Sequence, residues 1–415
     1  MTRRWKTAAR LPRIALGTAA AVFISQIAVA TAITGVDALR KKRDTPGGFP
    51  ALPPHETRVA STQLTTYSEG GQLYDDMLAA IEGAERTILF ESYIWKDDEV
   101  GRRFKDALTA AAHRGVKVFI IYDQFANLVV PPRFKNFDPA LYVLPFPLFR
   151  PGMLTLNPRY FGRDHRKILV VDEEIGFVGG FNIGKLYADE WRDTHVRLEG
   201  DGVWELSNAF VDFWNSSRTS DLPELPDRGA KSWDSRIRAA LNMPNRMIFP
   251  VRGLYLEAFD RATENIWLTQ GYFLPDEDIL RSLKDACARG VDVRIIVPAE
   301  SNHIVADWVS RGCYTTLLQA GARIFLYRNT MVHAKTAVVD DRWCTVGTTN
   351  IDRLSFFGNF EVNLEIFDRD QAATMRAVFE KDLTNCDEVR LEDWEARHWS
   401  RRALERFLHP LRPLL

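Results

Sequence analysis

One pattern of polar residues occurs twice in this chain at a constant separation. Each copy holds a His, a Lys two positions on, an Asp five positions after the Lys, and then a Gly, an Asn and a carboxylate at matching places. The matched pairs are His165 and His333, Lys167 and Lys335, Asp172 and Asp340, Gly179 and Gly347, Asn182 and Asn350, and Asp193 and Glu361. The histidines are 168 residues apart (333 − 165 = 168), and every other pair keeps the same offset. A register kept over six positions predicts two similar lobes.

Length and composition fit this division. At 415 residues the chain exceeds what one hydrophobic core usually fills, so two or three folded units are expected. Hydrophobic residues make up 46% and charged residues 26%, which is ordinary for a folded globular protein. The formal net charge of −1 supplies no basic field of the kind that drives nucleic-acid binding, and it weighs against a nuclease.

Both lobes show the alternation of strands and helices that builds an α/β fold. In the first lobe a strand at 86–95 precedes a helix at 99–114 and a strand at 116–122. In the second lobe a helix at 276–289 precedes a strand at 291–297 in the same way. Because a strand, helix, strand unit makes parallel neighbours, each lobe is predicted to be a mixed, mostly parallel sheet flanked by helices.

Changes of composition along the chain give the predicted domain boundaries. They are an N-terminal anchor or signal helix at 1–45, a Pro- and Gly-rich linker at 46–59, a first lobe at 60–235, a second lobe at 236–390 and a C-terminal amphipathic tail at 391–415. For the tail, a helix docked on the second lobe is favoured over a helix that lies in a membrane interface.

The N-terminal region contains a long apolar stretch. Residues 14–36 are 23 residues without a charge, and a helix needs about 20 residues to cross the hydrocarbon core of a bilayer. This length favours an uncleaved membrane anchor. A cleaved signal peptide, with Ala28, Val29 and Ala30 as its cleavage site, is the alternative. Basic residues flank the stretch on both sides, so the membrane side of the lobes stays open.

A second apolar segment lies inside the first lobe. Residues 126–160 combine several prolines with aromatic residues. Because apolar side chains are costly to expose, this segment either packs on the lobe or forms a lip that meets lipid. The sequence leaves both interpretations open.

The doubled motif resembles the signature of the phospholipase D superfamily. The stretches RDHRKILVVDEEIGFVGGFNIG and GTTNIDRLSFFGNFEVN are similar to the bacterial cardiolipin synthase branch of that superfamily. The resemblance covers most of the two predicted lobes. It implies two tandem phospholipase D-like lobes, related by a pseudo-twofold axis, that bring His165 and His333 together.

The resemblance also implies roles for the repeated residues. Cleavage of a phosphodiester needs a nucleophile, a proton for the leaving alcohol and positive charge around the phosphoryl oxygens. His165 is the implied nucleophile, which forms a phosphohistidine, and His333 is the implied general acid and base. The implied partners across the lobes are Asp193 for His333 and Glu361 for His165. The side chains expected to hold the non-bridging oxygens are Lys167, Lys335, Asn182 and Asn350.

Each of the remaining residues around the motif has two possible roles. Asp172 and Asp340 belong to the motif and are counted with the candidate site, but a structural role at the ends of their strands is favoured over a chemical one. Tyr93 and Tyr272, together with Glu91, either line the pocket or belong to the core.

No cofactor and no metal are expected, since two lysines supply the positive charge that the phosphoryl group needs. The four cysteines lack the paired spacing of zinc or redox sites, and they are expected to be free thiols: Cys287, Cys313, Cys344 and Cys386. The sequence departs from the family pattern in two places. Asp164 stands where many relatives have Asn, and NIDRLS lacks an Arg directly before its Ser. These departures leave the substrate preference open.

Four functions are consistent with these observations to different degrees. The favoured one is a phosphatidyltransferase of the cardiolipin synthase type, and the first alternative is a phospholipase D that transfers the group to water. A nuclease and an inactive membrane scaffold are disfavoured by the net charge and by the intact motif in both lobes. The expected partners are phospholipids and a membrane, most simply the bacterial plasma membrane, with no nucleic acid and no obligate protein partner.

Overall fold

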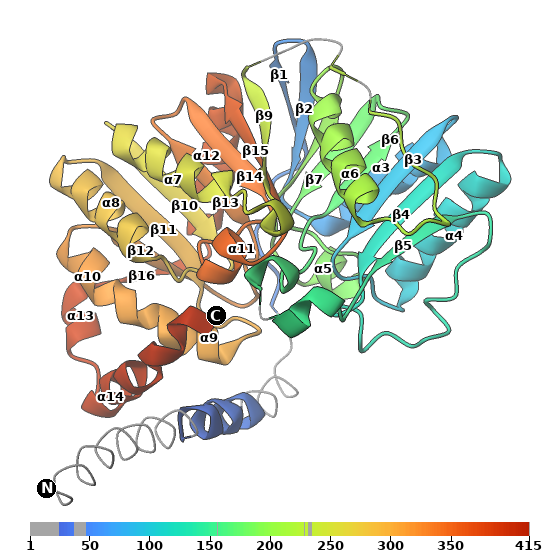
Figure 1. Cartoon of the computed structure of the whole chain (residues 1–415). Coiled ribbons are helices and arrows are strands. Elements are labelled where there is room, and N and C mark those ends of the chain that lie inside the picture. Colours follow the sequence, from blue (N-terminus) through green and yellow to red (C-terminus); the bar gives the residue numbers. More distant parts are fainter. Residues whose placement is uncertain (1–24, 37–46, 156, 228, 231–234, 415) are drawn as a thin grey trace, which may run out of the picture.

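The computed structural model describes residues 25–36, 47–155, 157–227, 229–230 and 235–414. Two lobes lie side by side, and each is built on an eight-stranded sheet with helices on its faces (Figure 1). The strand orders are β1-β2-β8-β7-β6-β3-β4-β5 in the first sheet and β16-β12-β11-β10-β13-β14-β15-β9 in the second. The α/β class and the two tandem lobes predicted from the repeat are confirmed.

The first lobe contains β1 to β8. Its strands are β1 (His55–Val59), β2 (Thr62–Tyr67), β3 (Thr87–Ser92), β4 (Lys117–Asp123), β5 (Tyr142–Phe146), β6 (Ile168–Val171), β7 (Ile175–Gly179) and β8 (His195–Glu199). Its helices are α3 (Gly70–Glu82), α4 (Glu99–His113), α5 (Lys185–Asp189) and α6 (Val203–Ser217), with short 3₁₀ turns η1 (Pro151–Thr155) and η2 (Pro158–Tyr160).

The second lobe contains β9 to β16. Its strands are β9 (Ile237–Asn242), β10 (Asn265–Gln270), β11 (Asp292–Pro298), β12 (Arg323–Tyr327), β13 (Lys335–Val339), β14 (Trp343–Gly347), β15 (Glu361–Phe367) and β16 (Cys386–Val389). Its helices are α7 (Pro250–Arg261), α8 (Glu277–Ala288), α9 (Ile304–Ser310), α10 (Tyr314–Gln319), α11 (Arg353–Phe357), α12 (Arg369–Leu383), α13 (Leu391–Glu395) and α14 (Trp399–Leu408), with η3 (Pro244–Arg246), η4 (Arg311–Cys313) and η5 (His409–Leu414).

The prediction that the sheets are mostly parallel is wrong. In each sheet only two neighbouring pairs are parallel, β3–β4 and β4–β5 in the first and β10–β11 and β11–β12 in the second. The other five pairs of each sheet are antiparallel. The strands that follow each motif His are joined by tight turns at Asp172 and Asp340, whose φ angles are 54° and 52°. A tight turn can join only antiparallel neighbours.

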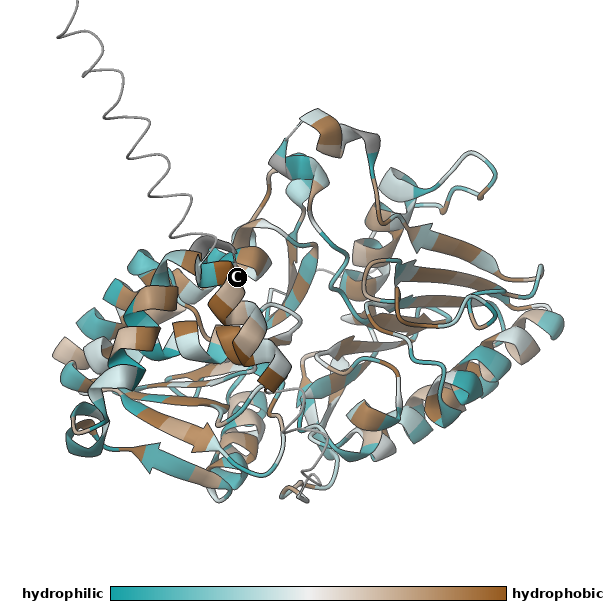
Figure 2. Cartoon of the chain, turned by 90° about the horizontal axis from the view of Figure 1, so that it is seen from below, coloured by the Kyte–Doolittle hydropathy of each residue, from teal (hydrophilic) through white to brown (hydrophobic). Residues whose placement is uncertain are grey.

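One hydrophobic cluster joins the two lobes. It contains Phe210 and Phe213 of α6 from the first lobe and Val362 of β15 and Met375 of α12 from the second. Figure 2 shows that apolar residues concentrate in the strands of both sheets, which the helices cover. Because burial of apolar surface is the main favourable contribution to folding, this shared core makes the two lobes one packed unit.

Residues 25–36 of the predicted N-terminal span are helical. Gln26 Nε2 donates a hydrogen bond of 2.7 Å to the Phe407 carbonyl of α14, and Val29, Ala30 and Ile33 pack in the cluster that α9 and α14 form. Among the described residues, no helix combines the length and the apolar character needed to cross a bilayer. Residues 14–24 of the predicted span lie outside the described residues.

Two other predicted segments take part in regular structure. Within the predicted linker at 46–59, residues 55–59 form β1, which pairs antiparallel with β2 at the edge of the first sheet. In the predicted tail at 391–415, α14 packs on α9, and Leu408 is fully buried. The tail therefore docks on the second lobe, as its amphipathic pattern favours.

Candidate active site

The two motif histidines precede β6 and β13 at the edge where the lobes meet. Each is held there by backbone pairing with the other lobe. Asp164 forms a parallel bridge with Phe360, and Arg192 forms one with Val332. His165 N donates to the Phe360 carbonyl at 3.0 Å, and His333 N donates to the Arg192 carbonyl at 2.7 Å.

These two bridges are copies of one interaction. The offset between Asp164 and Val332 is 168 (332 − 164 = 168), and the offset between Arg192 and Phe360 is the same (360 − 192 = 168). The offset of the sequence repeat is therefore also the offset of the contacts between the lobes. The pseudo-twofold axis runs through the site that the repeat predicted.

Each imidazole contacts a carboxylate from the opposite lobe. His165 Nδ1 lies 3.1 and 3.0 Å from Glu361 Oε1 and Oε2, and His333 Nδ1 lies 2.7 Å from Asp193 Oδ2. All four side chains are buried or nearly so. Because the carboxylate engages Nδ1, it fixes the tautomer and leaves Nε2 for chemistry. The contacts match the cross-lobe pairing that the family resemblance implies.

Two buried lysines lie beside the histidines. Lys167 Nζ donates to the His165 carbonyl at 2.5 Å, and Lys335 Nζ donates to the His333 carbonyl. Each ammonium has three N–H donors, so two remain for an anion. Burial is the largest influence on both groups, and it lowers the pKa of Lys167 to about 7 and that of Lys335 to about 8.

The acidic and basic groups of the two lobes are shifted differently. Burial, together with the lysine charges, holds the pKa of His165 well below its usual range and lowers that of His333 to about 3, although Asp193 opposes the fall at His333. Burial raises the pKa of Glu361 to about 8. Burial also acts on Asp193, but the charges of Lys335 and His333 outweigh it and keep the pKa of Asp193 below its usual value.

The two asparagines occupy matching positions of the repeat, and both are buried. Asn182 Oδ1 accepts a hydrogen bond of 3.2 Å from Ile94 N. Asn350 is buried, and its Oδ1 has no hydrogen-bond partner among the described residues. A buried amide oxygen without a partner is costly, so Asn350 Oδ1 has unused capacity to accept a hydrogen bond.

Asp172 and Asp340 lie at the far ends of β6 and β13, away from the histidines. The Asp172 carboxylate accepts hydrogen bonds of 2.7 to 2.8 Å from the backbone N–H groups of residues 85–87. The Asp340 carboxylate accepts the equivalent bonds from residues 263–265. The structure therefore does not bring these two aspartates together with the other candidate site residues. They fix the loops that enter β3 and β10, which is the structural role that the sequence favoured.

Aromatic rings line the histidines. The Tyr93 ring lies edge-on to His165 at 4.7 Å between centroids, and Trp191 and Tyr272 lie 5.2 and 6.2 Å from His333. The sequence left open whether the two tyrosines line the pocket or belong to the core. In the structure both rings lie against the histidines. Glu91 belongs to the core, because it is fully buried and paired with Arg166.

Two buried arginines support the histidine segments, and the repeat did not reveal them. Arg166 Nη2 lies 2.5 Å from Glu91 Oε1, and its Nε lies 3.4 Å from Asp164 Oδ1. Arg192 makes a two-pronged ion pair with Asp382 of α12, with both N···O distances at 2.8 Å. A signal existed for Arg166. Its repeat partner is Ala334 (334 − 166 = 168), and a charge that replaces a buried alanine needs a partner.

Apolar side chains are exposed on the loops around this edge. They lie in the segments after β4 and β5, in the turn before α7, and in α11. The residues are Phe125, Leu128, Val129, Phe149, Leu154, Met247, Ile248, Leu354 and Phe357. Val129 and Leu154 are the most exposed, at 79% and 78%. Val130, Phe134 and Leu141 of the segment 126–160 are buried instead. That segment therefore both packs on the lobe and presents apolar tips. We call the exposed set the apolar rim.

A tight glycine contact brings the carboxylate to its histidine. A Cβ on Gly180 would lie 2.1 Å from Asp193 Oδ1, far inside van der Waals contact. Only glycine at this position lets Asp193 approach His333. The repeat pointed to Gly179, but an added Cβ would make its closer contact at the neighbouring Gly180.

Comparisons with known proteins agree with this geometry. A family model described as cardiolipin synthase, phospholipase D-like domain, matches residues 77–214 and 255–383. A cardiolipin synthase of Clostridium perfringens is 33% identical over 378 residues, which cover 87% of this chain and 79% of the relative. A cardiolipin synthase of Staphylococcus aureus is 35% identical over 346 residues, which cover 80% of this chain and 69% of the relative.

A solved structure supports the fold. The phosphatidylserine synthase of Haemophilus influenzae aligns with a TM-score of 0.67 at 13% sequence identity, over 88% of this chain and 95% of that chain. At this identity the likeness concerns the fold alone.

Proposed function

The chain belongs to the cardiolipin synthase family with phospholipase D-like domains, and on this premise we propose that it transfers a phosphatidyl group from one phosphatidylglycerol to the hydroxyl of another. One observation carries the proposal. Two buried imidazoles, each bound through Nδ1 to a carboxylate of the opposite lobe, lie beside two buried lysines at one interface. This set supplies the nucleophile, the acid and the positive charge that phosphodiester cleavage needs.

In the first half of the proposed reaction, Nε2 of neutral His165 attacks phosphorus. A P–N bond forms, and the P–O bond to the glycerol headgroup breaks. Protonated His333 donates its Nε2 proton to the departing oxygen, which leaves as glycerol. The products of this step are a phosphatidyl group on His165 and a neutral His333.

In the second half, the hydroxyl of a second phosphatidylglycerol enters. Neutral His333 takes the hydroxyl proton as the oxygen attacks phosphorus, and the P–N bond to His165 breaks. The product carries two phosphatidyl groups on one glycerol, and both histidines return to their starting protonation. If water enters instead, the same step releases phosphatidic acid, which is the activity of a phospholipase D.

The lysines suit a phosphodiester anion. Lys167 and Lys335 can donate to the non-bridging oxygens, and the side-chain N–H groups of Asn350 are of the donor type that such oxygens accept from. A bound anion also offsets the lysine charges that lower the pKa of both imidazoles. Substrate binding therefore favours the protonated His333 that the first step requires, with Asp193 as the counter-charge.

We further propose that the active-site edge faces a membrane, through the apolar rim and an anchor at 14–36, in a bacterial plasma membrane. The proposed partners are phospholipids and this membrane, with no nucleic acid and no obligate protein partner. Val29, Ala30 and Ile33 share a hydrophobic cluster with Tyr272, which supports a position of the N-terminal helix next to the active-site edge. Apolar side chains that enter the headgroup region stabilise such binding.

The membrane proposal can be tested by the double variant Val129→Asp with Leu154→Asp. We expect about tenfold weaker sedimentation with phosphatidylglycerol vesicles, because two exposed apolar side chains lose their transfer free energy. Phe367→Asp is a matched control, since Phe367 is an exposed apolar residue at the opposite end of β15. Equal binding of the double variant and the wild type would contradict the membrane-facing rim.

The reaction is tested by lipid analysis with the purified full-length chain and phosphatidylglycerol in mixed micelles, with and without phosphatidylethanolamine. Release of glycerol together with a four-chain lipid supports transfer. Phosphatidic acid as the sole product would replace transfer by hydrolysis. A chain with neither product, but with normal vesicle binding, would leave only the scaffold function.

A further inference from the structure

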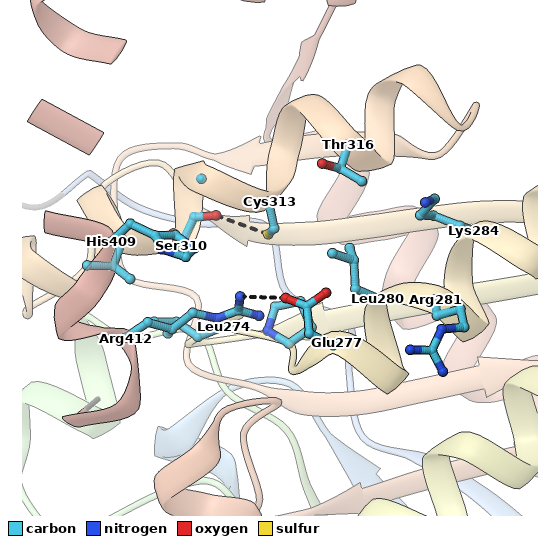
Figure 3. A pocket seen from close by; sticks show the side chains of 13 residues that line it. Leu274, Glu277, Leu280, Arg281, Lys284, Ser310, Cys313, Thr316, His409 and Arg412 are labelled. Carbon is cyan, nitrogen blue, oxygen red and sulfur yellow. Dashed lines mark hydrogen bonds and ion pairs between the residues drawn. The ribbon is translucent and has the colours of Figure 1, made fainter. Parts of the chain in front are cut away.

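A second cavity lies in the second lobe, apart from the histidines. It has a volume of about 300 Å³ and is enclosed by α8, by the turn from α9 to η4, and by the C-terminal segment η5. Figure 3 shows Arg412 and His409 at one side of this cavity and Arg281 and Lys284 at the other. We call it the tail pocket, because the docked C-terminal tail closes it.

The charge of the tail pocket is positive. Its lining contains Arg281, Lys284 and Arg412 against one carboxylate, Glu277, and the His409 imidazole adds further hydrogen-bonding capacity. Arg281 has Asp278 at 3.2 Å as a partner outside the lining, and Lys284 makes no ion pair with any described residue. An anion that enters the pocket therefore meets a net positive lining.

Arg412 supplies an independent sign of a missing ligand. Its Nη1 lies 3.5 Å from Glu277 Oε1, as Figure 3 shows, while its Nη2 is shielded from solvent and has no hydrogen-bond partner among the described residues. A guanidinium N–H removed from water without a partner is costly. Planar, two-pronged donation to a phosphate is the interaction that a guanidinium makes best.

We propose that the tail pocket binds a phosphate ester, such as the headgroup of an anionic phospholipid or free glycerol phosphate. The cavity volume lies at the lower end of the range for small-ligand sites, which suits a phosphate with a glycerol but excludes acyl chains. Leu274 forms part of the lining and is two residues from Tyr272, whose ring faces His333. The backbone N–H of Leu274 also donates to the Ile351 carbonyl at 2.7 Å, next to Asn350. Occupancy of the tail pocket can thus affect the reaction site.

The proposal is tested by the rate at which Lys284 is acetylated in the full-length chain, followed by peptide mass spectrometry. Lys117, at the exposed start of β4 in the other lobe, is the internal control. Its acetylation shows whether a probe merely consumes the reagent. The probes are glycerol phosphate, inorganic phosphate, phosphatidylglycerol vesicles and phosphatidylcholine vesicles. We expect at least one phosphate ester to slow acetylation of Lys284 and not of Lys117.

Two variants connect the protection to the pocket. Arg412→Gln and Arg281→Gln are each expected to raise the ligand concentration needed for protection about tenfold, the loss of one charge-assisted contact. Arg402→Gln, an exposed arginine of α14 outside the lining, is the matched control. Because Arg281 is exposed on α8, its variant keeps the test decisive if Arg412→Gln disturbs the tail.

The outcomes separate the sources of the ligand. Protection by phosphatidylglycerol vesicles alone identifies a lipid headgroup, and protection by glycerol phosphate in solution identifies a free ester. Protection by inorganic phosphate alone, equal protection by phosphatidylcholine vesicles, no protection by any probe, or protection unchanged in both variants would overturn the proposal. The assay needs no turnover, so it can fail while phosphatidyl transfer proceeds, and it can succeed in a chain that transfers nothing.

Discussion

The two halves of the active site present the same side chains but support them by different means. Behind His165, a cluster of three buried ionisable side chains, Glu91, Arg166 and Asp164, lies in the core of the first lobe. Behind His333, the same positions hold Thr269, Ala334 and Val332, and the buried ion pair is Arg192 with Asp382. The chemistry of the repeat is preserved, and the scaffold under it has diverged.

The difference extends to the carboxylates. Asp193 is held below its usual pKa and stays ionised, so it stabilises a cation on His333. Burial raises the pKa of Glu361 to about 8, so at neutral pH this group carries a proton and gives His165 no counter-charge. The pKa of both imidazoles is lowered, but at His333 the ionised Asp193 opposes the fall, so a bound anion protonates His333 more easily than His165. The half-sites are therefore suited to different roles, although their motifs are alike.

The largest expected effect is on the nucleophile. His165→Ala is expected to lower turnover by about 10⁴-fold or more and to abolish the trapped phosphoenzyme, because no other group can form the P–N bond. With an aryl phosphodiester whose leaving group needs no acid, His333→Ala should still form the phosphoenzyme. His113→Ala, on the exposed face of α4, is the control. A phosphoenzyme in His165→Ala would reverse the roles of the two half-sites.

The next effect separates the two carboxylates. Asp193→Asn is expected to lower turnover about 10³-fold, because it removes the charge that favours protonated His333. Glu361→Gln is expected to have a small effect near pH 7, where Glu361 already carries a proton. Since the carboxylate forms only above a pKa of about 8, the difference between wild type and Glu361→Gln should grow as the pH rises past that value. Initial rates across this pH range measure both, and equal losses at pH 7 would contradict the asymmetry.

The buried cluster behind His165 is expected to matter for stability. Arg166→Met removes the cation that pairs with the buried Glu91 and should cost about 3 kcal/mol or more in the free energy of unfolding. The triple variant Glu91→Thr, Asp164→Val and Arg166→Ala introduces the residues of the second lobe. It should recover most of that loss. Urea denaturation measures the difference. An equal loss in both variants would show that the arginine acts through packing and not through charge.

A smaller effect is expected on the binding of an inhibitory anion, because each half-site contributes one lysine whose charge depends on pH. Lys167 and Lys335 are cationic below pKa values of about 7 and 8, so inhibition by sulfate, whose own charge is constant here, should weaken as the pH rises through that window, by about tenfold overall. Lys335→Met should leave only the step near pH 7. Inhibition that does not vary between pH 6 and 9 would contradict these shifts.

The smallest expected effect is none at all. If one lysine from each half-site supplies the positive charge, a strong chelator such as EDTA should leave turnover unchanged. A loss of activity that added Mg²⁺ or Zn²⁺ restores would show that the two half-sites need more charge than their lysines provide.

Sequence reasoning failed where the direction and the pairing of strands within a lobe had to be predicted. The strand, helix, strand units at β3–β4 and β10–β11 are real, but they cover a minority of each sheet, and the meander after each motif His makes the rest antiparallel. Residues 55–59 lack an apolar pattern, and they became β1 because the free edge of β2 offered hydrogen bonds. Backbone pairing at a sheet edge leaves little trace in side-chain periodicity.

By itself, the sequence determined that the chain is a duplicated α/β unit and which polar residues both copies keep, because a constant offset of 168 survives only where position is constrained. Only the tertiary structure decided which of those residues meet. It brought Glu361 to His165 and Asp193 to His333, bound Asp172 and Asp340 to the backbone of neighbouring loops, and added Arg166 and Arg192 beneath the site. The physical reason is that burial and distance set the charge state of a carboxylate, and neither is encoded in spacing along one chain.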